Sequence, residues 1–308
     1  MAQERRLREK AGLSTNPWDE RAGHFRGATL QGMGKNDRFI DFISTLVTSE
    51  KTLLDVGAGT GRHALPLARL AKRVTAVEPS EGMRRFMKVE ATRLQLKNLY
   101  IVPKTWEEAE VEPCDIAYCS HVLLHVADMA QFLEKLRDHA REYCVMVMGT
   151  VQQNVRLLEL WKLVHGEERC PHPDFVEHFN VIYQAIGICP NIEVTSSRIG
   201  RVPGASYTSL EDAVNYVARQ LFLAQDAPEI KSVRNYLKDH LIVENGRLTL
   251  PGPASPDAIL WWDNRPGSPN LARVSAGLWK GKKKTRKSNL EILKHSRAQE
   301  GVFPIERA

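Results

Sequence analysis

The stretch that decides the expected fold is Leu53-Leu54-Asp55-Val56-Gly57-Ala58-Gly59-Thr60-Gly61-Arg62-His63-Ala64. Its apolar residues predict a buried strand that runs directly into a glycine-rich turn, and a helix is predicted to follow. Glycine has no Cβ atom, so the backbone can turn tightly there and approach a ligand closely. The first amide groups of the following helix are available to an anionic group. The segment therefore predicts a ligand-binding loop between a strand and a helix.

A second feature lies at the end of the next predicted strand. The segment Val74-Thr75-Ala76-Val77 precedes Glu78, which stands 21 residues after Gly57. A carboxylate in that position can accept both hydroxyl hydrogens of a ribose. A glycine turn alone is a weak signal, and it is also compatible with a tight turn that binds nothing and a solvated glutamate. Strand, glycine turn, helix, strand and terminal acid in this order form a strong signal for a nucleoside site.

Strands and helices alternate outward from this segment. Short apolar runs predict strands at 52–56, 73–77, 99–102, 115–119 and 143–148. Helical spacing of apolar residues predicts helices at 37–47, 62–71, 81–95 and 129–140, with a short turn near 106–110. Strands that alternate with helices at this spacing indicate βαβ units and a parallel sheet. Right-handed crossovers then place helices on both faces of the sheet.

The regular alternation of strands and helices ends after residue 150. Helices are predicted at 151–165, 174–186, 210–224 and 228–240, with strands at 192–199 and 258–263. The additional helices are too few for an independent domain, so we predict cap insertions at about 151–190 and 208–244. The domain that contains them is predicted to span residues 36–264. Residues 1–35 are predicted to be a flexible arm or lid, and residues 265–308 a flexible basic tail.

The sequence DVGAGTGR, followed by AVEPS, resembles motif I and its acidic partner in the class I S-adenosylmethionine (SAM)-dependent methyltransferases. The similar pattern runs from about Asp37 to Gly149, and AILWWD at 258–263 resembles the reversed last strand of that fold. Asp55 favours this family over dehydrogenases, whose Rossmann domains usually have no invariant acid in the strand before the glycines. The resemblance implies an α/β, Rossmann-like, doubly wound fold, with a mostly parallel seven-stranded sheet, a reversed last strand and a helical cap insertion.

The resemblance also implies which residues bind SAM and its product S-adenosylhomocysteine (SAH). Asp55 would orient the loop or contact the SAM amine, and Glu78 would hold the ribose. Pro79 and Met83 would lie against the adenine, although Met83 suits a helix core equally well. The full set predicted to bind the cofactor is Asp55, Gly57, Ala58, Gly59, Gly61, Glu78, Pro79, Met83, Thr105, Trp106, Ser120 and His121.

The adenine side departs from the family pattern. The family often has an aspartate after the third strand, whereas this chain has Lys104-Thr105-Trp106-Glu107 there. Trp106 would then cover the adenine ring, and Thr105 or Glu107 would take the place of the acid.

The residues after the fourth predicted strand indicate where chemistry would occur. Parallel sheets place ligands at the carboxyl ends of their strands, so Ser120 and His121 should face the methionine half of SAM. A base is needed only when the acceptor carries a proton at neutral pH, and an imidazole ordinarily titrates near pH 6.5, so His121 is the candidate base. His125, one helical turn further on, is either a core or capping residue or part of the acceptor pocket. The acceptor pocket is predicted to include Trp18, His24, Phe25 and His125.

The same segment disfavours several acceptor classes. Enzymes that methylate amino groups resemble one another in an Asn/Asp-Pro-Pro-aromatic tetrad after the fourth strand, where this chain has Cys119-Ser120-His121-Val122. Enzymes that methylate cytosine at C5 need a Pro-Cys pair after that strand, whereas Pro113-Cys114 lies before it. We therefore predict methyl transfer to a small molecule with a nitrogen, oxygen or sulfur nucleophile. A different class of hypothesis is a protein that binds SAM without turnover.

Charge is unevenly distributed along the chain. The net charge is +6, but residues 265–308 alone hold 11 lysines and arginines against three acidic residues. This run leaves a second alternative open, in which the tail contacts RNA or an acidic protein as the methyl acceptor. The competing interpretation is a solvated tail without a partner.

Composition bounds the remaining possibilities. No apolar stretch is long enough to cross a membrane, and the charged first residues lack the apolar core of a signal peptide, so a cytoplasmic protein is predicted. The five cysteines are odd in number and form no CxxC pair, which favours reduced thiols. Cys170, His172 and His178 are a weak match to a metal site, and no metal is predicted.

Overall fold

The computed structural model describes residues 2–13, 18–19, 22–23, 25, 37–151, 155–170, 172–195, 206–244, 246–252 and 256–270. All of these residues belong to one compact unit, Met1–Ala272. The predictions made for His24, for the side chain of His125 and for the tail after residue 270 lie outside the described residues. Among the helices that are described, none is long and apolar enough to cross a membrane.

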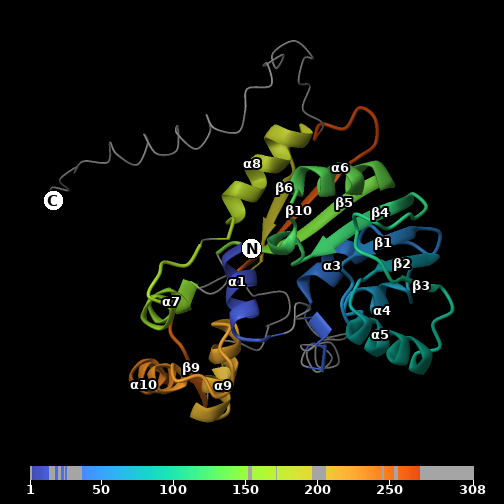
Figure 1. The fold of residues 1–308 in the computed structure, drawn as a ribbon. Helices are drawn as coiled ribbons and strands as arrows, with labels where there is room; N and C mark the ends of the chain where they lie inside the picture. Colours follow the sequence, from blue (N-terminus) through green and yellow to red (C-terminus); the bar gives the residue numbers. More distant parts are fainter. Residues whose placement is uncertain are drawn as a thin grey trace, which may run out of the picture. The chain divides into compact units, whose positions relative to one another are not determined.

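A seven-stranded sheet forms the centre of the fold, with the strand order β3-β2-β1-β4-β5-β10-β6 (Figure 1). Strand β10 pairs antiparallel with both β5 and β6, whereas the pairs from β3 to β5 are parallel. The predicted mostly parallel sheet with a reversed last strand is thereby confirmed. The strands are β1 Thr52–Val56, β2 Arg73–Val77, β3 Leu99–Val102, β4 Cys114–Ser120, β5 Ala140–Gly149, β6 Asn191–Val194 and β10 Asp257–Asp263.

Helices cover both faces of this sheet (Figure 1). Successive strand residues point to opposite faces, so Leu53 packs in one core cluster and Leu54 in the other. The Leu53 cluster includes residues from α3 Arg38–Ser44, α4 Ala64–Leu67 and α5 Glu81–Arg93. The Leu54 cluster includes residues from α6 Met129–His139 and α8 Phe175–Ile186. This two-sided core is the doubly wound arrangement that the alternation predicted.

The cap has a hydrophobic core of its own. Trp161, Val217 and Leu237 are buried in this third cluster. Its helices are α7 Leu158–His165, α9 Leu210–Gln220 and α10 Ile230–His240, preceded by a 3-10 turn at Val155–Leu157. A small sheet in the order β7-β9-β8 accompanies them, formed by Ser206–Tyr207, Arg247–Thr249 and Ile242–Glu244. The sequence predicted the helices but not this sheet, because its strands are too short to show a period.

The N-terminal residues differ from the flexible arm that the sequence predicted. Residues Ala2–Lys10 form helix α1, and Leu7 is buried in the core of the cap. The carboxylate of Glu4 accepts a hydrogen bond from Arg169 at 2.7 Å and lies 3.0 Å from His172 Nε2. One buried apolar side chain and one buried ion pair therefore dock a helix whose other side chains are mostly polar.

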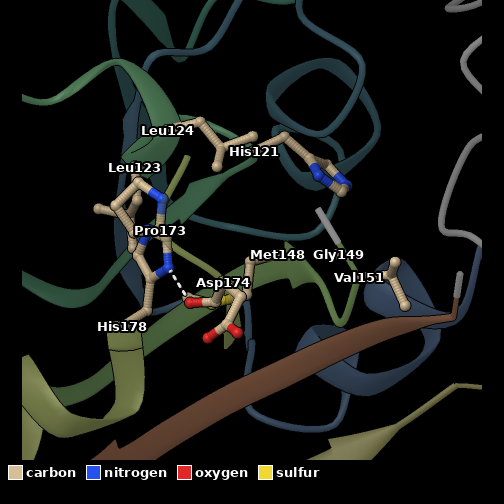
Figure 2. Close-up of a pocket in the computed structure, with 9 residues that line it drawn as sticks. All are labelled: His121, Leu123, Leu124, Met148, Gly149, Val151, Pro173, Asp174 and His178. Carbon is tan, nitrogen blue, oxygen red and sulfur yellow. Dashed lines mark hydrogen bonds between the residues drawn. The ribbon is translucent and has the colours of Figure 1, made fainter. Parts of the chain in front are cut away.

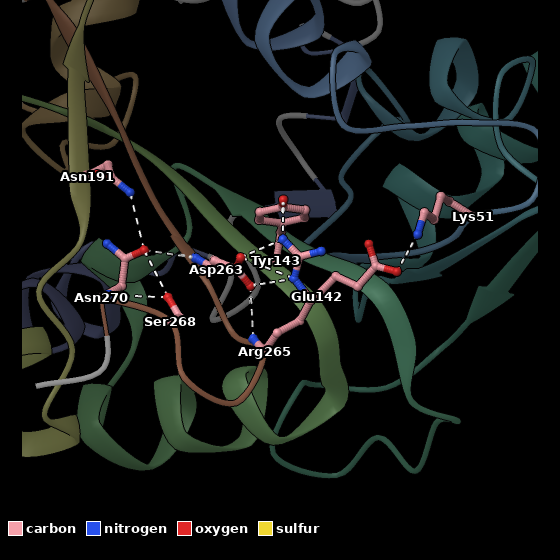
Figure 3. A network of polar contacts seen from close by, with 8 residues as sticks. All are labelled: Lys51, Glu142, Tyr143, Asn191, Asp263, Arg265, Ser268 and Asn270. Atoms are coloured by element: carbon pink, nitrogen blue, oxygen red, sulfur yellow. Dashed lines mark hydrogen bonds and ion pairs between the residues drawn. The ribbon is translucent and has the colours of Figure 1, made fainter. Parts of the chain in front are cut away.

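The end of the domain also lies later than predicted. Asn264 donates to the carbonyl of Arg137, and Arg265 binds both Asp263 and the hydroxyl of Tyr143. Figure 3 shows how Asn270 continues this network, with its side-chain oxygen accepting from the Asp263 amide at 3.2 Å. The described residues after 264 are thus bonded to the sheet, whereas the sequence assigned residues 265–308 to a flexible tail. The segment that contains Pro266, Gly267 and Pro269 forms a hydrogen-bonded turn, in which the Ser268 amide donates to the carbonyl of Arg265 at 3.1 Å.

Candidate functional site

The glycine turn after β1 is tied to the neighbouring strand. The amides of Gly57 and Ala58 both donate to the carbonyl of Val77, at 2.8 and 3.1 Å. Gly57 has φ +74°, and a Cβ atom there would lie 2.4 Å from the side chain of Val122. Gly59 also has positive φ, but a Cβ atom there would meet nothing within 4 Å. The loop is therefore rigid at Gly57 and open on the side of Gly59.

The carboxylate of Glu78 joins this loop to the end of β2. One oxygen accepts from the Gly59 amide and the other from the Ser80 amide, both at 2.8 Å. Glu78 is only 6% exposed, and this burial raises the pKa of its carboxyl group, against the effect of the two amides. Each carboxylate oxygen has a further lone pair. The arrangement fits the ribose-binding role that the sequence predicted for Glu78.

Asp55 is a buried carboxylate with unfilled bonding capacity. Its Oδ2 atom has no hydrogen-bond partner among the described residues. Burial raises the pKa of Asp55 to about 7, and interactions with Tyr118 and the backbone of Ala64 oppose that rise. A buried carboxylate oxygen without a partner is costly unless a donor or a cation completes it. The site therefore fits an ammonium group such as the amine of SAM.

An ion-pair group that the sequence did not predict anchors the residues directly after the glycine loop. Asp37 accepts from Arg62 at 2.7 Å and lies 3.6 Å from the ring of His63. Asp37 also caps helix α3 by accepting from the Phe39 amide. Burial opposes its ionisation, yet His63 and Arg62 hold the pKa of Asp37 well below its usual range. The available signal was an aspartate directly before an apolar helical run, which is typical of a helix cap.

The N-terminal segment contacts the loop after β2. Asp19 accepts from the Ser80 hydroxyl at 2.5 Å and from the Gly82 amide at 2.8 Å. Because Ser80 also donates to Glu78, the segment is one hydrogen bond removed from the ribose carboxylate. The predicted pocket residues Trp18 and Phe25 have their rings 6.1 Å apart and are half-buried, but neither lines the cavity described below.

Two residues that were predicted to touch the cofactor have close packing contacts within the domain. Trp106 donates through its indole nitrogen to the carbonyl of Phe132 at 3.1 Å, and Lys135 lies 4.6 Å over its ring. A Cβ atom on Gly61 would lie 2.7 Å from Met87, so this glycine permits close packing against α5. The sequence placed Trp106 over the adenine and Gly61 in the set that binds the cofactor. It did not predict these packing contacts, and the contacts of both residues with the cofactor stay predictions.

The other candidates for the adenine side lie beside the two loops. Pro79 directly follows Glu78, and Met83 is buried at the start of α5, with its amide donating to Ser80 Oγ. Thr105 begins the turn after β3 through its carbonyl, which accepts from the Ala109 amide at 3.0 Å. Their adenine contacts stay a prediction.

Ser120 is the last residue of β4 and His121 follows it at the carboxyl edge, as the sequence predicted. His121 has φ +56°, which is uncommon for a residue with a side chain, and its amide donates to the carbonyl of Val147 at 2.9 Å. Its ring lies 3.6 Å from the carboxylate of Asp257, the first residue of β10. Uncommon backbone geometry of this kind is concentrated at functional sites.

His121 borders a small, partly open cavity at this edge of the sheet (Figure 2). Most of the side chains that enclose it are apolar, and its other imidazole, from His178, is bonded through Nδ1 to the carbonyl of Asp174 at 2.5 Å. The walls come from the ends of β4 and β5 and from the start of α8. The lining residues are His121, Leu123, Leu124, Met148, Gly149, Val151, Pro173, Asp174 and His178.

Cys170, His172 and His178, the weak match to a metal site, lie in different surroundings. Cys170 is exposed, His172 is paired with Glu4, and His178 is bonded to Asp174, so the three do not form a cluster. Within the described ranges no group of three or more metal-ligating side chains occurs. All five cysteines are free thiols, and burial raises the pKa of Cys114 to about 12, which keeps that thiol protonated.

Comparison with known proteins gives the family. A family model described as a methyltransferase domain matches residues 27–186, just over half of the chain. An uncharacterized protein of Haemophilus influenzae is 27% identical over 177 residues, which cover 57% of this chain and 65% of that protein. A ubiquinone biosynthesis O-methyltransferase of Caulobacter vibrioides is 33% identical over 117 residues, covering 36% of this chain and 45% of that enzyme. The match therefore spans less than two thirds of either relative.

A solved structure shows the same fold. The crystal structure of a candidate methyltransferase from Bacillus halodurans superimposes with a TM-score of 0.51 at 15% identity, over 75% of this chain and 100% of that one. Together with the family match, the strand order and the glycine loop, this likeness settles the class. The chain belongs to the methyltransferase domain family, whose Rossmann-like class I members take the methyl group from SAM.

Proposed function

We propose that this protein catalyses methyl transfer from SAM to a small organic acceptor. The observation that carries the proposal is the adjacency of two sites at one edge of the sheet. The first is the open glycine loop with the carboxylates of Asp55 and Glu78, and the second is the largely apolar cavity beside His121. The ubiquinone biosynthesis O-methyltransferases among the relatives act, by their names, on a small-molecule pathway, which favours the same acceptor class here.

The residues divide the binding work between them. Glu78 and the Gly59 amide would hold the ribose, and Asp55 would pair with the amine. When bound, SAM supplies an electrophilic methyl group. The apolar walls of the cavity would exclude water and position the acceptor, which provides much of the catalysis in an in-line displacement. His121 would remove a proton from an acceptor that carries one.

Two parts of the proposal concern segments outside the fold of the sheet. Asp19 would help to enclose the cofactor, because it is bonded at the loop that follows Glu78. The basic tail after residue 270 lies outside the described residues, and no observation favours RNA or protein as the acceptor over a small molecule.

Calorimetry with the full chain tests the cofactor half of the proposal. We expect SAM and SAH to bind and NAD to give no heat of binding, because the loop geometry and the unpartnered Asp55 match an amino-acid-bearing nucleoside. Tight binding of NAD without binding of SAM would overturn the proposed function.

A further inference from the structure

Strands β1 and β4 bring a second polar side chain to Asp55. The two strands pair in parallel, and Asp55 is in register with Tyr118. Residues in register on neighbouring strands point to the same face of the sheet, so the phenol ring lies beside the carboxyl group. Tyr118 is 0% exposed, on a strand whose other buried residues are cysteine, isoleucine and alanine. Phenylalanine would fill the same space, so the hydroxyl of Tyr118 calls for an explanation beyond packing.

The Tyr118 hydroxyl and the Oδ2 atom of Asp55 are both buried, and neither has a hydrogen bond of ordinary geometry to any residue that the structure describes. The hydroxyl nevertheless acts on Asp55, because it opposes the rise in the pKa of this carboxyl group that burial causes. Burial, together with Asp55, raises the pKa of Tyr118 well above its usual value, so the phenol keeps its proton. A hydrogen bond donated by Tyr118 to Asp55 would satisfy both buried atoms at once.

Aromatic packing holds the Tyr118 ring in place. Its centroid lies 5.4 Å from that of Phe39 on α3, and the Phe39 ring lies 4.6 Å from the ring of His63. Phe39 is buried, and its amide donates to Asp37, which caps the helix. The hydroxyl is therefore carried by a ring that neighbouring elements fix, as a positioning role requires.

The other groups that face Asp55 come from three elements. Glu78, at the end of β2, raises the pKa of Asp55 through its negative charge, whereas the backbone of Ala64 on α4 favours the carboxylate. The Cys119 thiol on β4 also interacts with Asp55, and burial raises the pKa of this thiol, so it stays neutral. Tyr118 is the strong side-chain donor among these groups. Its hydroxyl is therefore the side-chain group that favours the charged form of Asp55.

We propose that Tyr118 is a positioning residue for the cofactor, whose hydroxyl donates to Asp55, keeps this carboxyl group charged and directs a free oxygen lone pair toward the SAM amine. This inference rests on the proposed function, in which Asp55 pairs with that amine. A hydrogen bond to the charged form of a carboxyl group favours that form. Without the hydroxyl, Asp55 should be neutral at pH values at which the wild-type residue is charged, and a neutral carboxyl group does not attract an ammonium group.

Calorimetry of SAH binding to Tyr118→Phe at several pH values tests this role. If the pKa of Asp55 rises by about one unit from its value of about 7, the dissociation constant should be about tenfold above that of the wild type near pH 6 and less than about twofold above it near pH 8.5. Comparing the two proteins at each pH cancels the titration of the SAH amine itself. A ratio that does not change with pH would overturn the proposal, because a packing defect weakens binding equally at every pH.

The matched control is Tyr143→Phe on the neighbouring strand β5. It removes a tyrosine hydroxyl that accepts from Arg265 at 2.9 Å. The dissociation constant of this variant should equal that of the wild type at each pH. A pH-dependent ratio like the one expected for Tyr118→Phe would show that the effect does not belong to the pair of Tyr118 and Asp55.

A double-mutant cycle shows whether Tyr118 acts through Asp55. Asparagine cannot become charged, so adding Tyr118→Phe to Asp55→Asn should change the SAH dissociation constant by less than about twofold near pH 6. A further loss of about tenfold in that background would overturn the proposal and leave the proposed methyltransferase function standing. Failure of the wild-type protein to bind SAH at all would refute the proposed function itself.

A tyrosine analogue keeps the test decisive if Tyr118→Phe does not fold. The analogue 3-fluorotyrosine at position 118 retains the ring and the hydroxyl, and it is a stronger donor because its phenol is more acidic. Its effect should have the opposite sign, so SAH binding relative to the wild type should be strongest near pH 6 and should weaken toward pH 8.5. A relative affinity that is the same at both pH values would contradict the role of the hydroxyl.

Discussion

The carboxyl edge of the sheet has two halves that differ in what lines them. Over β1 and β2, the carboxylate of Glu78 binds two backbone amides, and Asp55 retains an unpartnered oxygen. Over β4 and β5, the walls are mainly leucine, methionine, valine and proline, and the polar residues among them are His121, Asp174 and His178. The first half is suited to a polar ligand held in one pose, and the second to a largely apolar ligand beside a few polar side chains.

This difference separates binding from chemistry. Substitutions in the first half should change the affinity for SAM and SAH, whereas substitutions at His121 should change turnover. A single variant that lost both cofactor affinity and turnover to a similar extent would contradict this distinction.

The largest effect is expected at His121. In His121→Ala, turnover should fall about 10²- to 10⁴-fold because the general base is lost. The affinity for SAH should stay close to that of the wild type, since the cofactor contacts lie over β1 and β2. Steady-state kinetics and calorimetry on the same preparation would measure both. Equal turnover in the two proteins would mean that catalysis depends on positioning and that His121 is only a wall of the cavity.

The next effect is expected at Glu78. Glu78→Ala should weaken SAH binding at least about tenfold, because it removes hydrogen bonds to a charged acceptor that contribute about 1.5–3 kcal/mol each. It also releases the Gly59 and Ser80 amides that the carboxylate holds. The exposed Glu112, replaced in the same way, is the control and should bind SAH normally. An unchanged dissociation constant for Glu78→Ala would show that this residue does not hold the ribose.

Asp55 should make cofactor binding depend on pH. Burial raises its pKa to about 7, so below that pH the carboxyl is neutral and cannot attract the SAH amine. Affinity should therefore rise as pH increases toward 7, by up to about tenfold per pH unit, and level off above it. Calorimetry between about pH 6 and pH 8, about one unit on either side of this pKa, would measure the slope. Asp55→Asn should bind weakly at every pH; an identical slope in that variant would contradict the assignment.

The smallest effect is expected at Trp106, which should affect the stability of the fold and not the affinity for SAH. Trp106→Phe should cost about 1–2 kcal/mol of stability, because the Phe132 carbonyl loses its buried donor. SAH affinity should not change, since the indole packs against Phe132 and Lys135. Urea unfolding and calorimetry would measure the two quantities. Weakened SAH binding at unchanged stability would restore the adenine-covering role that the sequence suggested.

The sequence predicted the cofactor half of the edge well because its signals are local. Strands β1, β2 and β3 have the predicted bounds, since each is a short run rich in apolar residues that is followed by Gly57, Glu78 or Pro103. Gly57 and Glu78 lie where their spacing placed them. The pairing of Asp257 with His121 escaped prediction because the two are far apart in the chain, and only the antiparallel register of β10 brings them together.

The cap and the termini were predicted less well for a related reason. Helix α1 carries few apolar residues, and its docking depends on Glu4 meeting Arg169 and His172 from a distant loop. The turn at 264–270 contains glycine and prolines, yet Asn270 bonds it to the sheet. Trp106 looked suited to an adenine because its core partners come from α6, which spacing alone does not place beside it.

The fate of a labelled methyl group tests the central claim most directly. The full chain would be incubated with SAM labelled in the methyl group and a whole-cell extract, which is then separated into small molecules, RNA and protein. We predict label in the small-molecule fraction, resistant to prior treatment of the extract with RNase and protease, and lost with His121→Ala. Label that appears in RNA or protein, or none in any fraction from protein that binds SAM, would contradict methyl transfer to a small molecule.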